Sequence, residues 1–144
     1  MTWLLNFARL SLVILLTGIV LVGCSLKLQV ALFNNTGERV TVRTESKIIA
    51  IDAGQSAQFD YPGEEQNWTL QLSTAACDYA YHVPKTLDHY PRPSVSNGLL
   101  KAQVEGNFGV YLLPPTATVP ASIAGLESLQ QDGFPLRPTS SNCR

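Results

Sequence analysis

Residues 26–43 read LKLQVALFNNTGERVTVR, and this stretch decides the fold class. Apolar residues occupy every second position from 26 to 32, and again at 40 and 42. That spacing is typical of a strand with one buried face. Asn34-Asn35-Thr36-Gly37 lies between the two runs, and these residue types favour a tight turn. We therefore expect two strands joined as a β-hairpin.

The same alternation continues along most of the chain. It predicts further strands at residues 47–51, 57–61, 68–72, 77–83, 100–104 and 108–112, the last two joined as a hairpin. Many short strands separated by turn residues indicate an all-β fold, here a small antiparallel β-sandwich of about 7–8 strands. We assign residues 28–113 to this core.

The alternation stops at Pro114, and the remaining 31 residues contain five prolines. We expect residues 114–144 to form a proline-rich tail packed on the sandwich. Their pattern allows one short helix at about residues 120–131, with Ile123, Leu126 and Leu129 on one side, although Gly125 weakens it.

The N-terminal segment has a different character. Residues 10–21 carry no charge, Arg9 precedes them, and the run ends in Leu21-Val22-Gly23-Cys24. A basic residue, a short apolar core and a small-residue cleavage site form a secretory signal. The final four residues resemble the lipobox of bacterial lipoproteins.

The resemblance implies that residues 1–23 are a cleaved signal peptide and that residues 24–27 are a lipidated Cys24 with a short tether. A diacylglyceryl group would be attached to the Cys24 sulfur, and two or three acyl chains give a durable anchor. Ser25 favours the outer membrane in the enterobacterial sorting pattern. The implied location is the cell envelope, on the outer membrane facing the periplasm of a Gram-negative bacterium.

An uncleaved membrane helix is the alternative interpretation of this segment. Residues 10–23 would span only about 21 Å, whereas the hydrocarbon core is roughly 30 Å thick. A longer helix would bury Arg9.

With Cys24 assigned to lipid, Cys77 and Cys143 remain as an even pair in an oxidising compartment. Such a pair predicts a disulfide. Two free thiols are the alternative. A metal site is disfavoured because two cysteines without a neighbouring histidine cannot supply four ligands.

Composition and motifs disfavour several function classes. Residues 24–144 contain 9 basic and 11 acidic side chains and no basic run, which argues against nucleic acid as a partner. His82 and His89 lie in no zinc-binding spacing, and Asp78 and His82 would be roughly 13 Å apart on one strand. No nucleophile elbow or phosphate-binding loop is present. We therefore expect no enzymatic activity, no cofactor and no metal.

The long irregular stretch from Pro84 to Gly98 contains the candidate partner-binding residues His89, Tyr90 and Arg92, set among prolines. Tyr and Arg are enriched at binding hot spots, and loops often carry function. The alternative is a loop that crosses one end of the sandwich, with Tyr90 covering a core edge.

The tether from Cys24 reaches roughly 14 Å at most, so a partner should be membrane-proximal. We expect a non-catalytic envelope lipoprotein, in an accessory or assembly role, that binds another envelope component. An inhibitor or immunity lipoprotein that captures a periplasm-active hydrolase is the alternative.

Overall fold

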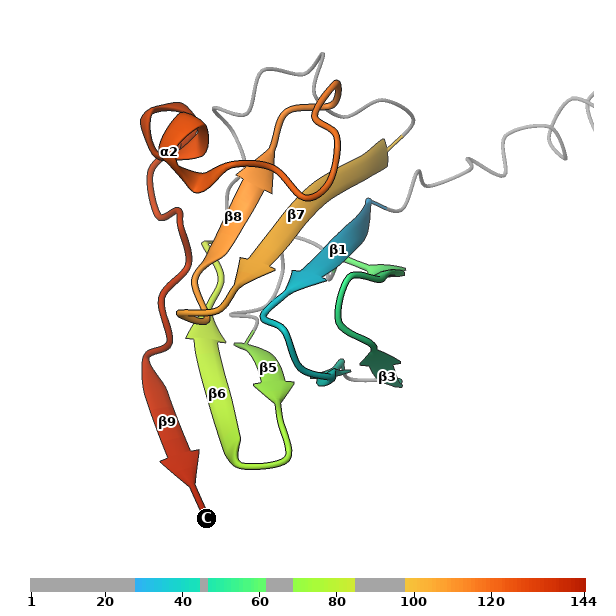
Figure 1. Cartoon of the computed structure of the whole chain (residues 1–144), viewed down its shortest axis with the longest axis vertical. Helices are drawn as coiled ribbons and strands as arrows, with labels where there is room; N and C mark the ends of the chain where they lie inside the picture. The colour runs from blue at the N-terminus through green and yellow to red at the C-terminus, as the bar shows by residue number, and fades with distance from the viewer. Residues whose placement is uncertain (1–27, 45–46, 62–68, 85–97) are drawn as a thin grey trace, which may run out of the picture.

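The structure, a computed structural model, describes residues 28–44, 47–61, 69–84 and 98–144. Their strands form two stacked sheets, one of four strands in the order β4-β1-β7-β8 and one of five in the order β3-β2-β5-β6-β9 (Figure 1). The expected all-β sandwich is confirmed. The strands are β1 Gln29–Asn35, β2 Val40–Arg43, β3 Ile48–Ile51, β4 Ser56–Asp60, β5 Thr69–Ser73, β6 Cys77–His82, β7 Leu99–Glu105, β8 Val110–Leu113 and β9 Ser140–Cys143.

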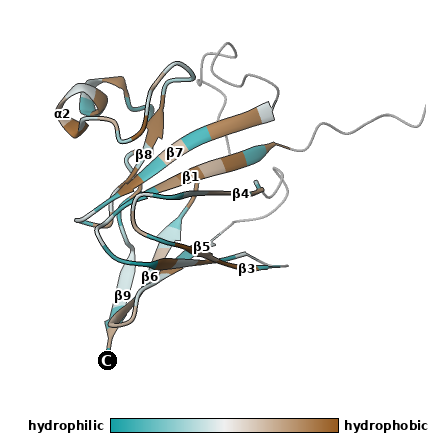
Figure 2. Cartoon of the chain, turned by 45° about the vertical axis from the view of Figure 1, so that its right-hand side comes forward, coloured by the Kyte–Doolittle hydropathy of each residue, from teal (hydrophilic) through white to brown (hydrophobic). Residues whose placement is uncertain are grey.

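Alternate residues of both sheets fill the space between the two layers, which Figure 2 shows edge on. Leu32, Val42, Leu72 and Val104 face inward and are at most 1% exposed. Tyr81 is also fully buried, and its hydroxyl donates to the Phe108 carbonyl oxygen at 2.8 Å. Because a buried hydroxyl needs a partner, this bond satisfies Tyr81 while linking β6 to the turn between β7 and β8.

The expected hairpin over residues 26–43 is wrong, because β1 and β2 lie in different sheets. The buried Asn34 side chain stabilises the turn at which the chain crosses. Its Oδ1 accepts from the Thr36 amide at 3.0 Å, and its Nδ2 donates to the carbonyl oxygens of Glu38 at 2.7 Å and Ile51 at 2.9 Å. These bonds hold the chain as it turns at the predicted residues and passes from one sheet to the other.

β1 and β7 run parallel, whereas the other paired strands are antiparallel. Gln29 lies opposite Leu99, so Leu28 and Gly98 are at the same end of the sandwich. Tyr61 joins this end, since its amide donates to the Leu28 carbonyl at 2.7 Å and its hydroxyl to the Pro84 carbonyl at 3.1 Å. We call this end the Leu28 end.

The opposite end contains the β5–β6 turn and the end of β9. The Arg144 amide donates to the Ala76 carbonyl oxygen at 3.0 Å, which places Arg144 beside this turn. We call it the Arg144 end. β6 separates the two ends by about 17 Å, five steps of ~3.3 Å.

The proline-rich tail packs on the outer face of β7 and β8, which we call the covered face (Figure 1). The expected short helix is present as α2 (Ile123–Leu126) followed by one 3₁₀ turn, η3 (Glu127–Leu129). Leu126 is buried against Tyr111 and Leu113 of β8. The expectation for Leu129 is wrong, because Leu129 lies in the 3₁₀ turn and its side chain is 62% exposed. The tail therefore buries outward-facing residues of the sheet in a second, smaller apolar cluster.

The Gln103 side chain fixes the tail to the covered face. Its Nε2 donates to the Ala121 carbonyl and its Oε1 accepts from the Ala121 amide, both at 2.9 Å. Gln103 Nε2 also donates to the buried Glu105 carboxylate, which accepts a second bond from Asn35 Nδ2 at 2.9 Å. The side chains of Gln103 and Glu105 beneath the tail are thus paired, as burial requires.

The tail also occupies the free edge of β8. The Gln130 side chain bonds both main-chain groups of Leu112, at 2.9 and 3.0 Å. Val110 and Leu136 exchange two main-chain hydrogen bonds at 3.0 and 2.9 Å. An exposed strand edge can pair with another chain, and these bonds remove that opportunity at β8.

The tail ends as β9, so the described residues form nine strands where about 7–8 were expected. β9 has the sequence SSNC, and all four residues are exposed. A strand with no buried face has no apolar alternation, which explains why the pattern did not predict it.

Candidate functional site: a polar groove on the five-stranded sheet

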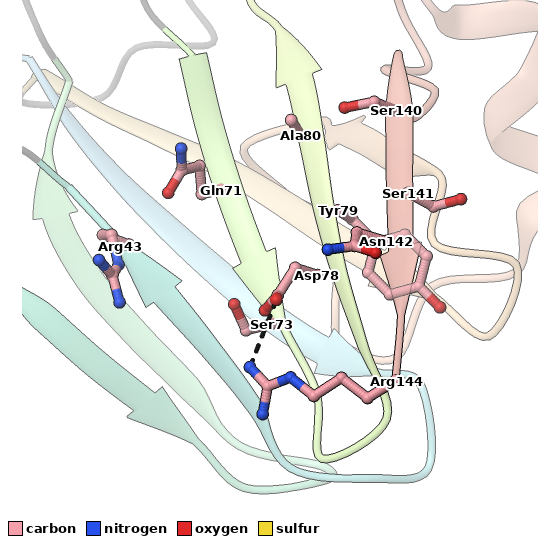
Figure 3. Close-up of a pocket in the computed structure, with 10 residues that line it drawn as sticks. All are labelled: Arg43, Gln71, Ser73, Asp78, Tyr79, Ala80, Ser140, Ser141, Asn142 and Arg144. Atoms are coloured by element: carbon pink, nitrogen blue, oxygen red, sulfur yellow. Dashed lines mark hydrogen bonds and ion pairs between the residues drawn. The ribbon is translucent and has the colours of Figure 1, made fainter.

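The outer face of the five-stranded sheet, which we call the open face, contains a concave pocket of about 350 Å³. Strand register brings its side chains together in two rows. Arg43, Gln71, Ala80 and Ser140 are successive neighbours across β2, β5, β6 and β9, and Ser73, Asp78 and Asn142 form the adjacent row. We call this pocket the polar groove; the residues that matter below are Arg43, Gln71, Ser73, Asp78, Asn142 and Arg144 (Figure 3).

Asp78 is the electrostatic centre of the polar groove. The Arg144 guanidinium lies 3.4 Å from its carboxylate, Nη2 to Oδ2. A hydrogen bond from Ser73, then the positive charges of Arg144 and Arg43, hold the pKa of Asp78 below its ordinary value. The carboxylate is therefore ionised at neutral pH.

Positive charge exceeds negative charge in the groove, since two guanidinium groups face one carboxylate. Arg144 is paired with Asp78, but neither of the two ion pairs among the described residues includes Arg43. Gln71, Ser73 and Asn142 add neutral donors and acceptors. The groove can hold a polar ligand through charge and hydrogen bonds.

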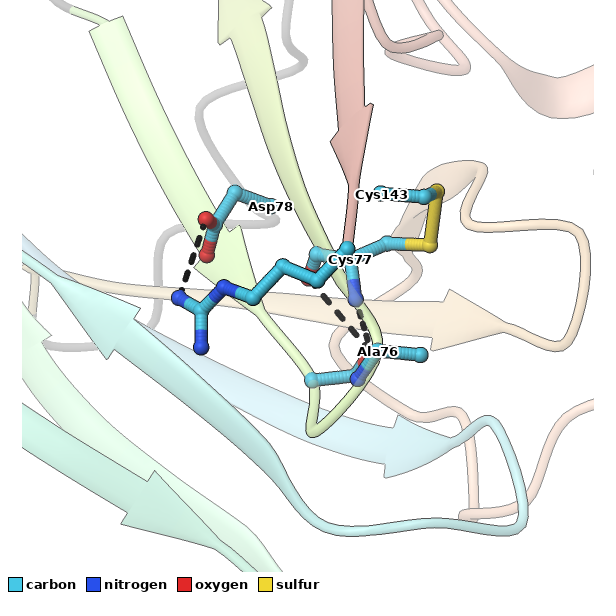
Figure 4. A network of polar contacts seen from close by, with 6 residues as sticks. Ala76, Cys77, Asp78 and Cys143 are labelled. Atoms are coloured by element: carbon cyan, nitrogen blue, oxygen red, sulfur yellow. Dashed lines mark hydrogen bonds and ion pairs between the residues drawn. A yellow bond between two sulfur atoms is a disulfide. The ribbon is translucent and has the colours of Figure 1, made fainter.

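The Cys77–Cys143 disulfide holds β9 in place as one wall of the groove (Figure 4). Cys77 lies directly opposite Cys143 in the β6–β9 pair, with 4.1 Å between the Cα atoms. The predicted disulfide is thus present in the structure. It joins the end of the tail to the strand that supplies Asp78, so Arg144 follows directly from a fixed position.

The other residues singled out in the sequence lie elsewhere. Cys24, His89, Tyr90 and Arg92 are outside the described residues. His82 is exposed near the Leu28 end of β6, opposite Thr69, and does not line the polar groove.

Sequence reasoning did not identify the polar groove. The alternation already put Asp78 on the solvent side of its strand and Arg43 on the polar positions of its own. Their convergence depends on strand order, which alternation does not report. Arg144 gave no signal, because it follows a strand that the pattern did not predict.

No protein family, curated protein or solved structure matches this chain. Within the described ranges, no group of three or more His, Cys, Asp or Glu side chains is placed to hold a metal ion. No helix in that part of the chain is long and apolar enough to cross a membrane.

Proposed function

We propose that this chain is a lipid-anchored envelope protein that binds a protein partner through the polar groove and catalyses no reaction. The observation that carries the proposal is the difference between the outer faces of the two sheets. The chain's own tail buries the covered face, whereas the open face stays concave, polar and accessible.

The Leu21-Val22-Gly23-Cys24 motif supports the lipid anchor. Only three residues separate Cys24 from Leu28, so acyl chains on Cys24 would hold the Leu28 end near the headgroups. The Arg144 end would then point away from the bilayer, and the groove would face sideways and outward. A partner in the periplasm, or the exposed part of a membrane protein, could reach it.

His89, Tyr90 and Arg92 fit the same proposal as a second contact. They lie in the segment between Pro84 and Gly98, and both of these flanking residues are at the Leu28 end.

Site-specific photocrosslinking in living cells tests the groove. A photoreactive amino acid at Gln71 should yield one discrete adduct with an envelope protein. The matched control is Gln58, an exposed glutamine on β4 of the other sheet, which should yield no such adduct. Equal adducts from both positions, or none from Gln71, would reject the groove as the docking surface.

Cys24→Ser tests the anchor. The variant should accumulate as a larger precursor that takes up no radiolabelled palmitate, and unchanged processing would reject lipidation. A soluble form lacking Cys24 should also lose function. Full activity of that form would favour a freely acting inhibitor of a periplasmic hydrolase.

A further inference from the structure

The charges of the polar groove define its occupant more closely, provided that the proposed function holds. We infer that the groove binds an extended acidic segment of the protein partner, with a carboxylate held by Arg43 and Arg144. Arg43 has no ion pair among the described residues, and the exposed Arg144 side chain contacts Asp78 only at 3.4 Å. An acidic ligand would neutralise the positive charge that Asp78 alone does not balance.

The neutral lining favours an extended polar segment over an apolar helix. Gln71, Ser73 and Asn142 offer hydrogen-bonding groups along the floor of the groove. The lining includes one aromatic residue, Tyr79, whose ring stacks on Phe108 with 4.0 Å between centroids. An amphipathic helix needs an apolar groove for its anchoring side chains, and this groove does not provide one.

The edge of β9 provides main-chain hydrogen-bonding groups for the same segment. Among the residues that the structure describes, β9 is the last strand of its sheet and has no neighbour beyond it. The Arg144 amide points toward β6. Main-chain groups in an antiparallel pair point alternately toward and away from the partner strand, so those of Ser141 and Cys143 point away from β6, toward the free edge. An extended peptide can add to such an edge as a further strand, and its side chains then lie next to the groove.

The position of Arg144 argues for a peptide rather than an anionic lipid headgroup. Arg144 lies at the end of the sandwich opposite Leu28, about 17 Å away along β6. A membrane that holds the Leu28 end is therefore remote from Arg144. Surface attraction to lipid charge decays within a Debye length, about 8–10 Å at physiological salt.

The test uses the full chain in neutral detergent micelles and a fluorescent ten-residue peptide of alternating Thr and Glu. The control peptide has Gln in place of Glu. Fluorescence anisotropy should show binding of the Glu peptide only, with affinity that falls as salt is raised. Arg43→Gln and Arg144→Gln should each weaken binding by about two- to fivefold, the range expected for exposed ion pairs.

Asp78→Asn should change the peptide affinity in the opposite direction and is therefore the most discriminating variant. It removes the carboxylate that competes for Arg144, so the Glu peptide should bind about two- to fivefold more tightly. Arg39→Gln is the matched control, because Arg39 pairs with Asp52 outside the groove and its loss should leave affinity unchanged. Circular dichroism of each variant checks that the fold is retained.

Several results would overturn the inference: equal binding of the Gln peptide, no loss in either arginine variant, or weaker binding after Asp78→Asn. Loss of binding to anionic vesicles in the same arginine variants, without loss of peptide binding, would assign these side chains to the membrane instead. The crosslink at Gln71 keeps the two proposals separable. If Gln71 captures a partner while the Glu peptide fails to bind, only the acidic specificity is wrong.

Discussion

Gln103 and Gln71 are both glutamines on the outer faces of the two sheets, but one is buried and the other is exposed. Gln103 is fully buried, and its amide bonds the main chain of Ala121 in both directions. Gln71 is exposed and lines the polar groove. One face is therefore part of the stabilising interior, and the other remains available to a ligand. Changes on the covered face should alter stability, and changes on the open face should alter binding.

The largest expected effect comes from the link between the two faces. The tail packs on the covered face and ends as β9, which the Cys77–Cys143 disulfide ties to the open face. The double variant Cys77→Ala/Cys143→Ala should lose about 4 kcal/mol of unfolding free energy, because the disulfide closes a long loop in the unfolded chain. Urea denaturation measures the loss.

Ser141→Ala, an exposed substitution in β9, is the control for this measurement and should change stability by less than about 0.5 kcal/mol. A loss below about 1 kcal/mol in the double variant would mean that β9 is held without the covalent bond.

The next largest loss of stability is expected on the covered face, and it tests the comparison of the two glutamines directly. Gln103→Ala should cost about 2–3 kcal/mol, because it leaves the main-chain groups of Ala121 and the Glu105 carboxylate without their buried partner. Gln71→Ala should cost less than about 0.5 kcal/mol. Equal losses in the two variants, measured by urea denaturation, would break the distinction between the faces.

A substitution in the core between the two faces should have a smaller effect on the unfolding free energy, and this effect should depend on pH. Tyr81→Phe should cost about 1 kcal/mol at pH 7, since it removes the bond to the Phe108 carbonyl. Burial, and to a lesser degree Tyr79, raises the pKa of Tyr81. The unfolded chain loses the phenolic proton near pH 10 while the folded chain retains it, so stability should fall as pH rises above about 10.

Tyr81→Phe should remove part of that alkaline fall, as urea midpoints between pH 7 and 11 would show. Burial also raises the pKa of Tyr61, so some of the fall should remain. An alkaline limb identical to that of the unsubstituted protein would contradict the assignment to Tyr81.

The smallest effect on stability is expected for a substitution on the open face. Asp78→Asn should change the melting temperature at pH 7 by less than Tyr81→Phe does, because the carboxylate is exposed to water. The pKa of Asp78 is lowered, so its contribution is present above the ordinary aspartate pKa and is lost as pH falls through that range. A loss at pH 7 as large as that of Tyr81→Phe would make Asp78 a structural residue rather than a binding one.

These two faces also show where sequence reasoning succeeds and where it stops. Alternation predicted the strands from β1 to β8, because each buries one face and its apolar residues recur at every second position. It did not predict β9, whose four residues are exposed, or the passage of the chain between sheets at Asn34. Both depend on contacts with residues distant in the sequence.

The candidate site was predictable only in part. The polar positions of β2 and β6, with Arg43 and Asp78, were identified as solvent-facing. Their assembly needs the neighbour order β2-β5-β6-β9, and a period of two specifies a face without specifying a neighbour. Gln103 was missed for a related reason: in the sequence alternation, a polar residue covered by the tail looks the same as a solvent-exposed one.

The parallel β1–β7 pair has a consequence for the order in which this chain folds. Each residue of β1 is paired with one seventy positions later, as Gln29 is with Leu99, whereas β2–β3, β5–β6 and β7–β8 join neighbouring strands. Closing a long loop costs entropy before the contacts form, and such topologies fold in milliseconds to seconds. The local hairpins should therefore assemble first, and β1, although it is the first of the described strands and lies inside its sheet, should gain its β7 partner late.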